Sequence, residues 1–261
     1  MIKKVLSILA ITLVSFNLVS CIVKTGFEDN STIFTSNKNG EKVSEEYEIS
    51  GVNSIDIEVD AAIVKIKNYD GDTIKVEGYL GKSSKGLTNK KKSDEVEIVE
   101  KCSKKVVNND LSDYEILIPS NFNGDLSFTI GLGTGDLNDV KVNELEVESG
   151  TGEFNINNVV FNKLDLSCGV GNVTMNLNEK CGDMDIEGGV GETIINIKEV
   201  GGNLTCEGGV GSTKITLPEN APVKFNTESG LGKCNISART SGENTYTFNL
   251  EVGVGDIKIT N

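Results

Sequence analysis

The chain has 261 residues, with 39 acidic against 25 basic residues and a formal net charge of −14 at neutral pH. It contains no histidine, no tryptophan and a single arginine, Arg239. This composition argues against nucleic-acid binding, because contact with phosphates needs concentrated positive charge.

The first twenty residues are predicted to be a signal peptide. A short basic start, with Lys3 and Lys4, precedes an apolar run that ends in Leu18, Val19, Ser20 and Cys21. This order is typical of a signal segment, and the run is too short for a transmembrane helix. It resembles a bacterial lipoprotein signal, in which Cys21 is lipidated and becomes the mature N-terminus. The alternative is an ordinary secretory signal with an incidental cysteine.

Lipidation predicts a location. Attachment through more than one acyl chain gives stable anchoring, so we expect the mature protein on the extracytoplasmic face of the bacterial cell membrane. Residues 21–46 are polar and weakly patterned, which predicts a flexible tether. Residues 47–261 form the expected folded domain.

A glycine-flanked step recurs through the second half of the chain, and it predicts a stacked repeat of about twenty residues. The steps are Gly133-Thr134-Gly135, Gly150-Thr151-Gly152, Gly169-Val170-Gly171, Gly189-Val190-Gly191, Gly209-Val210-Gly211, Gly230-Leu231-Gly232 and Gly253-Val254-Gly255. An earlier copy without glycines begins near Ile55.

The hydrophobic pattern changes phase at each step. In one unit Met184, Ile186 and Val190 share one parity, whereas Ile195 and Ile197 share the other. A strand keeps one face inward across such a switch only if a bulge or corner absorbs a residue, and glycine suits that position. The predicted fold is all-β, a single-stranded β-solenoid with about twenty residues per coil. The alternative is a β-sandwich.

The segment at residues 81–112 is expected to be an irregular insertion, in which a hairpin or loop interrupts strand-like stretches such as residues 96–99. It is rich in lysine: Lys82, Lys85, Lys90, Lys91, Lys92, Lys101, Lys104 and Lys105. These lysines are either a solvated loop or a contact with anionic lipid headgroups or an anionic wall polymer.

Five cysteines besides Cys21 are expected to be structural. Cys168, Cys206 and Cys234 fall at inward positions of the repeat, where cysteine acts as a small buried hydrophobe. No Cys-x-x-Cys pair is present, so the sequence predicts no zinc site. A disulfide between neighbouring coils is left open.

A column of acidic residues emerges when the units are aligned. Glutamates stand two residues before the first glycine of most steps, at Glu148, Glu187, Glu207, Glu228 and Glu251. Stacking would place the last four in one outward row, with Asp165 and Asp185 two residues earlier in their units. We interpret this column as a solvated acidic face; a weak row of calcium sites is the alternative, and no other cofactor is predicted. A second column, with Asn157, Asn176 and Asn196, is expected to hydrogen-bond along the axis.

The repeat carries a family resemblance. The lipoprotein signal, the Gly-x-Gly steps and strands such as Tyr114–Pro119 are similar to the bacterial putative-adhesin ("toastrack") family of domains of unknown function. The resemblance covers residues 47–261. It implies a β-solenoid at the cell envelope, associated with adhesion or envelope-stress sensing, with no catalytic residues to carry over.

The predicted function is therefore a membrane-anchored, non-catalytic module that binds an unknown protein or envelope polymer. The alternative is a polysaccharide lyase or hydrolase that uses paired carboxylates. The sequence shows acidic residues in abundance but no recurring catalytic set. Because the chain stops at Asn261 directly after a complete unit, we also expect self-association through an open C-terminal coil.

Overall fold

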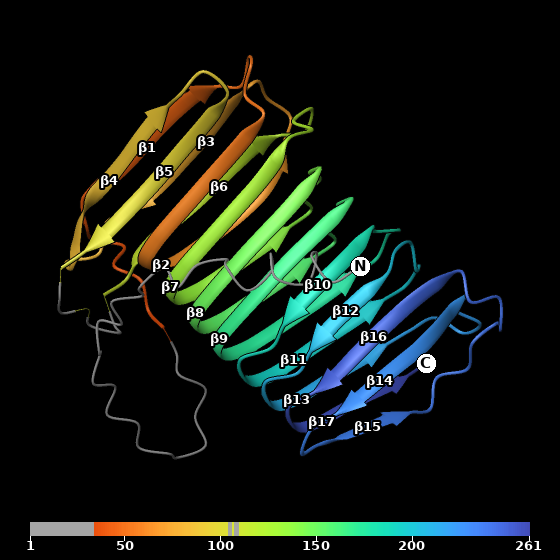
Figure 1. Cartoon of the computed structure of the whole chain (residues 1–261). Helices are drawn as coiled ribbons and strands as arrows, with labels where there is room; N and C mark the ends of the chain where they lie inside the picture. The colour runs from red at the N-terminus through yellow and green to blue at the C-terminus, as the bar shows by residue number, and fades with distance from the viewer. Residues whose placement is uncertain (1–33, 104–105, 107–109) are drawn as a thin grey trace, which may run out of the picture.

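The computed structural model describes residues 34–103, 106 and 110–261 of the chain (Figure 1). The predicted signal peptide, Cys21 and the first part of the predicted tether lie outside the described residues. Within the described ranges no helix has the length and apolar character of a membrane span.

The described residues build one sheet of seventeen strands that winds into a solenoid, as predicted. The strands are β1 (Lys42–Glu48), β2 (Ser54–Tyr69), β3 (Thr73–Tyr79), β4 (Ser84–Lys91), β5 (Glu95–Cys102), β6 (Ser112–Pro119), β7 (Asp125–Asn138), β8 (Glu144–Asn157), β9 (Lys163–Leu177), β10 (Asp183–Glu187), β11 (Val190–Ile197), β12 (Leu204–Glu207), β13 (Val210–Thr216), β14 (Val223–Ser229), β15 (Lys233–Ile236), β16 (Tyr246–Val252) and β17 (Val254–Thr260).

Each coil crosses one layer of the solenoid, bends at its glycine step and returns across a second layer (Figure 1). β7, β8 and β9 pass through the bend as single long strands, whereas later coils break there into pairs such as β10 and β11. Coils stack in parallel register, with Leu166 beside Ile186 and Ile186 beside Cys206. Phe128 lies before the bend of β7, in the first layer, and Phe154 lies after the bend of β8, in the second layer. The centroids of their rings are 5.5 Å apart. The two layers therefore face each other across one core.

The core is a continuous column of aliphatic and aromatic side chains. Among the described residues it runs from Val43 through Ile55, Leu164 and Ile195 to Ile259. Because one coil of about twenty residues buries too little apolar surface to offset its ordering entropy, this shared column is what makes the stack stable. The described residues thus share one continuous core.

The second glycine of most steps, though not Gly232, adopts a backbone conformation that other residues avoid. Gly191 and Gly211 have φ values of 148° and 147°. An added Cβ at Gly211 would lie 1.9 Å from the carbonyl oxygen of Gly191 in the coil below. The glycines therefore permit both the bend and the close stacking of successive bends.

The first glycine step lies two residues earlier than the sequence predicted. Gly133 pairs with Gly152, so the step of β7 is Gly131-Leu132-Gly133 rather than Gly133-Thr134-Gly135. Gly135 has another role, because a Cβ there would lie 2.4 Å from the Phe154 ring. It leaves room for an aromatic side chain in the core.

Of the two alternatives for the N-terminal end of the solenoid, a hairpin or a loop, the structure has the hairpin. β4 and β5 form an antiparallel hairpin, and β5 adds to β2 in parallel, so much of the expected irregular insertion is a regular part of the first layer. β1 pairs with β3 and begins at Lys42, inside the stretch predicted to be a tether. An isolated bridge joins Ser36 to Leu111.

The coils at the other end do not stack in chain order. β16 lies between β12 and β14, and β17 lies between β13 and β15. The last strands of the chain are thus interior, and the outermost coil is formed by residues 223–236 (Figure 1). The prediction of an open C-terminal coil is wrong: alignment gives each unit's length and register, but not which unit sits beside which.

Asparagine ladders tie the second layer together, as predicted. Asn157 donates to Asn138 at 3.1 Å, Asn176 donates to Asn157 at 2.7 Å and Asn196 donates to Asn176 at 2.9 Å, each from Nδ2 to Oδ1. Each inner amide is both donor and acceptor. The ladder adds polar support to the register set by the core.

Candidate binding face

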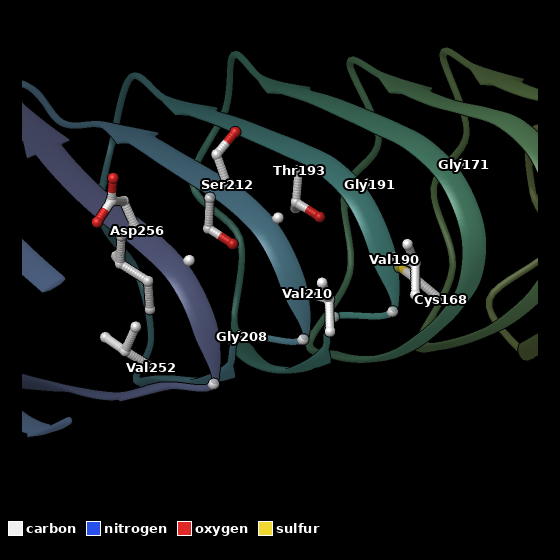
Figure 2. Close-up of a pocket in the computed structure, with 18 residues that line it drawn as sticks. Cys168, Gly171, Val190, Gly191, Thr193, Gly208, Val210, Ser212, Val252 and Asp256 are labelled. Carbon is white, nitrogen blue, oxygen red and sulfur yellow. The ribbon is translucent and has the colours of Figure 1, made fainter. Parts of the chain in front are cut away.

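An exposed aliphatic ridge runs along the bends of the last five coils. In register order it consists of Val170, Val190, Val210, Val254 and Leu231. The four valines are 49–53% exposed and Leu231 is 89% exposed. Figure 2 shows Val190 and Val210 at the bends of neighbouring coils. At a coil spacing of about 4.8 Å the ridge is roughly 19 Å long.

The sequence pattern had grouped these valines with the inward residues, and this was wrong. Alternation from Met184 and Ile186 would place Val190 inward. The backbone bends before it completes that alternation, so Gly188 takes the inward position and Val190 lies on the outside of the bend. The available signal was the pair of glycines around each valine, which marks the valine as the apex of a bend rather than a strand residue.

A glutamate row runs beside the ridge on the first layer. Glu148 is followed in register by Ser167, Glu187, Glu207, Glu251 and Glu228. The predicted run of four adjacent glutamates is therefore present, although Glu251 and Glu228 exchange places because the last coils are exchanged. All five glutamates are exposed.

A second acidic row follows two residues further from the bend. Glu146, Asp165 and Asp185 are neighbours in register on β8, β9 and β10. Lys163 Nζ lies 2.6 Å from Asp165 Oδ2 and offsets part of the negative charge. The predicted site residues of the acidic column thus lie on one surface, together with Glu146, which was not singled out from the sequence. This surface is here called the acidic face: Glu146, Glu148, Asp165, Asp185, Glu187, Glu207, Glu228 and Glu251.

Crowding on the acidic face disfavours full ionisation. Partial burial, and then the charges of Glu251 and Glu187, raise the pKa of Glu207 above its usual value. Partial burial and the charge of Asp165 raise the pKa of Asp185, and burial with Glu148 and Asp165 raises that of Glu146. A cation that approaches this face would relieve the repulsion.

Polar residues also flank the ridge on its other side. Glu153, Asn172, Glu192, Ser212, Asp256 and Lys233 follow one another there, two residues after the apex of each bend. Glu192 is paired with Lys214 at 2.5 Å, and this pairing lowers the pKa of Glu192. The ridge is therefore bordered by carboxylates on both sides, with the higher density on the acidic face.

A small cavity lies behind the ridge, inside the bends. Gly188 and Gly208 leave a space that Cys168, Thr193 and Thr213 line (Figure 2). Its volume of about 20 Å³ is enough for one water molecule. A cavity of this size cannot admit a sugar ring, so it does not add a substrate pocket to the carboxylates outside.

The five described cysteines are free thiols. Cys206 is buried, and Cys168 and Cys234 pack against the core, as predicted from their inward parity. Burial raises the pKa of Cys206 to about 12 and that of Cys168 to about 11. Such thiols are poor nucleophiles and poor metal ligands at neutral pH.

The described residues show no group of three or more His, Cys, Asp or Glu side chains arranged to hold a metal ion. The carboxylates of the acidic face are set one per coil along straight rows, whereas calcium requires six to eight oxygens converging on one point. The calcium row stays an untested prediction.

The lysine-rich segment lies at the opposite end of the solenoid from the ridge. Lys92 pairs with Glu95 at 2.6 Å, and Lys101 pairs with Glu58 and Asp60. Lys85, Lys90 and Lys91 are exposed on the edge strand β4. Lys104 and Lys105 lie outside the described residues. Contact of this segment with an anionic surface stays a prediction.

Comparisons with known proteins bear on the whole solenoid. The family whose model matches is described as Toastrack DUF4097, and the match spans residues 52–260. No curated protein matches the chain.

Solved bacterial structures are similar over most of their length. A "putative lipid binding protein" from Parabacteroides distasonis matches with 17% identity and a TM-score of 0.45, covering 86% of this chain and 99% of its own. A "putative adhesin" from Bacteroides fragilis matches with 18% identity and a TM-score of 0.43, covering 84% and 97%. A "putative cell adhesion protein" from Clostridium sporogenes matches with 20% identity and a TM-score of 0.39, covering 84% and 98%. On the family match, which spans most of the chain, this protein belongs to the Toastrack DUF4097 family.

Proposed function

We propose that the protein is a lipid-anchored, non-catalytic binding module of the bacterial cell envelope. Its binding surface is the aliphatic ridge together with the acidic face. The observation that carries the proposal is the coincidence of the two: five successive coils expose an aliphatic side chain at the bend, and an almost unbroken glutamate row runs beside it.

The chemistry of this surface selects its partner. A ridge of half-exposed valines gains free energy when covered, at roughly 25 cal/mol for each Å² of apolar surface removed from water. The glutamate row, crowded enough to raise the pKa of Glu207, favours a ligand that brings positive charge. The partner is therefore a cationic, extended polypeptide segment that carries both basic and apolar side chains.

Charge and ridge have separate roles in this proposal. The acidic face attracts the partner from a distance and sets the salt dependence of association. The ridge holds the partner after contact, and its loss increases the dissociation rate. Adhesion to a basic surface protein is the use that this division of roles supports.

Binding is tested by titrating the protein with a peptide of alternating lysine and leucine. The variant with Glu187, Glu207 and Glu251 changed to Gln is expected to bind at least tenfold more weakly at low salt, because each lost carboxylate contributes on the order of 0.5 kcal/mol or more. Calorimetry gives the affinity, and a calcium titration in the same cell tests the cation alternative.

The matched control removes the same charge elsewhere. Glu45, Glu46 and Glu48 lie on β1, at the far end of the solenoid, and their change to Gln is expected to alter the affinity less than twofold. Equal weakening by both variants would show that net charge alone attracts the peptide. Val190→Ser with Val210→Ser tests the ridge without altering charge.

The membrane anchor is tested separately. Cys21→Ala removes the thiol that would carry the lipid, so the protein is expected to lose a radiolabelled fatty acid and to leave the membrane fraction of producing cells. Ser20→Ala, which retains the cysteine and a small residue before it, should behave as the wild type. An unlipidated wild-type protein would reject anchoring and leave the binding surface unaffected.

A further inference from the structure

The outermost coil of the solenoid is unfinished on one side. β14 pairs with β16, and β15 pairs with β17. Within the part of the chain that the structure describes, no strand lies on the other side of β14 or β15. This coil therefore presents a free strand edge on each of the two layers.

Inward positions that are buried in the neighbouring coil are open in this one. Leu250 is buried, whereas Thr227, its register partner, is exposed. Ile259 is fully buried, whereas Ile236 is 38% exposed.

Two further side chains of this coil are only half covered. Phe225 packs edge-to-face on Phe248, with ring centroids 6.0 Å apart, and its other side lacks a neighbouring coil. Cys234 is half-buried beside the fully covered Ile257. Among the described residues, nothing covers the end of the core column at residues 223–236.

The other end of the solenoid is protected in a way that this end is not. The edge strand β4 carries Lys85, Lys90 and Lys91, and lysine on an edge strand opposes pairing with another chain. The edge strand β14 has one lysine, Lys224, and one glutamate, Glu228. This pair of opposite charges stands symmetrically about Asn226.

We propose that the open coil docks a second copy of this chain through an antiparallel β14–β14 pair, related by a twofold axis at Asn226. In this register Lys224 lies opposite Glu228 of the partner subunit, and the contact occurs twice. Phe225 lies opposite Thr227 of the partner subunit, so the two inward faces continue each other. The charges of β14 are thus complementary to a second copy of the same strand.

Asn226 supplies the centre of the contact. Its Nδ2 donates to Asn249 Oδ1 at 2.8 Å, which extends the side-chain hydrogen bonding between coils to the end of the solenoid. The Oδ1 of Asn226 is a hydrogen-bond acceptor, and in this register the amide of Asn226 of the partner subunit can donate to it. The dimer would close both open ends, since an isologous contact uses the same surface on both copies.

Charge exchange tests the register. The full-length lipoprotein in detergent and the fragment 34–261 in buffer are examined side by side by sedimentation velocity. Both are expected to dimerise, and Lys224→Glu and Glu228→Lys should each weaken the dimer at least tenfold, because each places like charges opposite one another. An equimolar mixture of the two variants should restore dimers, since the hybrid again pairs opposite charges.

A disulfide cross-link tests the position of the proposed twofold axis at Asn226. Asn226→Cys is expected to give a disulfide-linked dimer on mild oxidation, because residues opposite one another in an antiparallel pair lie within disulfide range. Asn249→Cys, one coil further in, should not cross-link. Thermal melting confirms that each variant is folded.

Three results would overturn the inference. They are a strictly monomeric fragment at high concentration, open-ended polymers in place of dimers, and a mixture of charge variants that stays monomeric. A fragment that dimerises while the full-length chain does not would also reject it, because the N-terminal residues would then occupy the open coil.

Discussion

Gly211→Ala is expected to lower the free energy of unfolding by about 3–5 kcal/mol. Its φ of 147° lies in a region that only glycine occupies without strain, and the added Cβ would meet the carbonyl oxygen of Gly191 at 1.9 Å. Backbone strain of about 1–3 kcal/mol and steric overlap of similar size both contribute. Urea denaturation followed by circular dichroism measures the change.

Gly208→Ala is the matched control, because Gly208 lies three residues before Gly211 in the same bend. A Cβ at Gly208 would lie 3.3 Å from its nearest neighbour, the carbonyl oxygen of Glu251, and it would point toward the small cavity inside the bend. Its expected effect is within about 1 kcal/mol of the wild type, since reduced freedom of the unfolded chain offsets the tight contact. Equal losses for the two variants would contradict the role assigned to the second glycine.

Glu100→Gln is expected to stabilise the protein at pH 8, by about 1–3 kcal/mol. Glu100 is fully buried on β5 and accepts a hydrogen bond from Ser112 Oγ, but its Oε2 has no hydrogen-bond partner among the described residues. Burial raises the pKa of Glu100 above its usual 4.5, although hydrogen bonds from Ser112 and Ser84 partly oppose the rise.

Because folding raises the pKa of Glu100, this carboxyl makes the protein less stable as the pH rises. A carboxyl whose pKa is raised by folding stabilises the protein fully below about pH 4.5, and this contribution is lost as the pH rises through the folded-state pKa. The advantage of Glu100→Gln should therefore grow between pH 4.5 and pH 8. Thermal melts across this range measure it.

Comparison with the wild type removes the contribution of other carboxyl groups to the pH dependence of stability. Asp56, Glu146, Asp185 and Glu207 also have raised pKa values, but both proteins contain them. Glu97→Gln, an outward change on the same strand, should show no growing advantage because Glu97 pairs with Lys92 at the surface. A difference between Glu100→Gln and wild type that does not vary with pH would contradict a buried charge at Glu100.

Much of this fold could be predicted because its determinants are local and periodic. Alternation, the glycine step and the stacked asparagines each recur every coil, so the register of Glu187 with Glu207 follows from alignment alone. The order of the last coils could not be predicted. β14 and β16 each carry an inward phenylalanine, Phe225 and Phe248, and the chain's long return through residues 237–245 allows either strand to stack first.

The ridge was missed for a related reason. Assigning side chains to the inward or outward face by counting residues assumes an unbroken strand. At Val190 the backbone bends, so the count fails and the side chain is exposed. The register of the first step failed similarly, because Gly135 matches the spacing rule but serves the packing of Phe154. The acidic face needed only the register, so all of its residues except Glu146 were predicted from the sequence.

The order of the last coils decides which coil forms the open end and which glutamates are neighbours on the acidic face, so it is the feature to measure first. We would introduce cysteine pairs on the acidic face, Glu207→Cys with Glu251→Cys in one variant and Glu207→Cys with Glu228→Cys in another. Peptide mapping after mild oxidation identifies the linked residues. Efficient linkage of 207 to 251, with little linkage of 207 to 228, is predicted because the first pair is adjacent in register and the second is separated by a strand. The reverse result would show that the coils stack in chain order and would contradict the account.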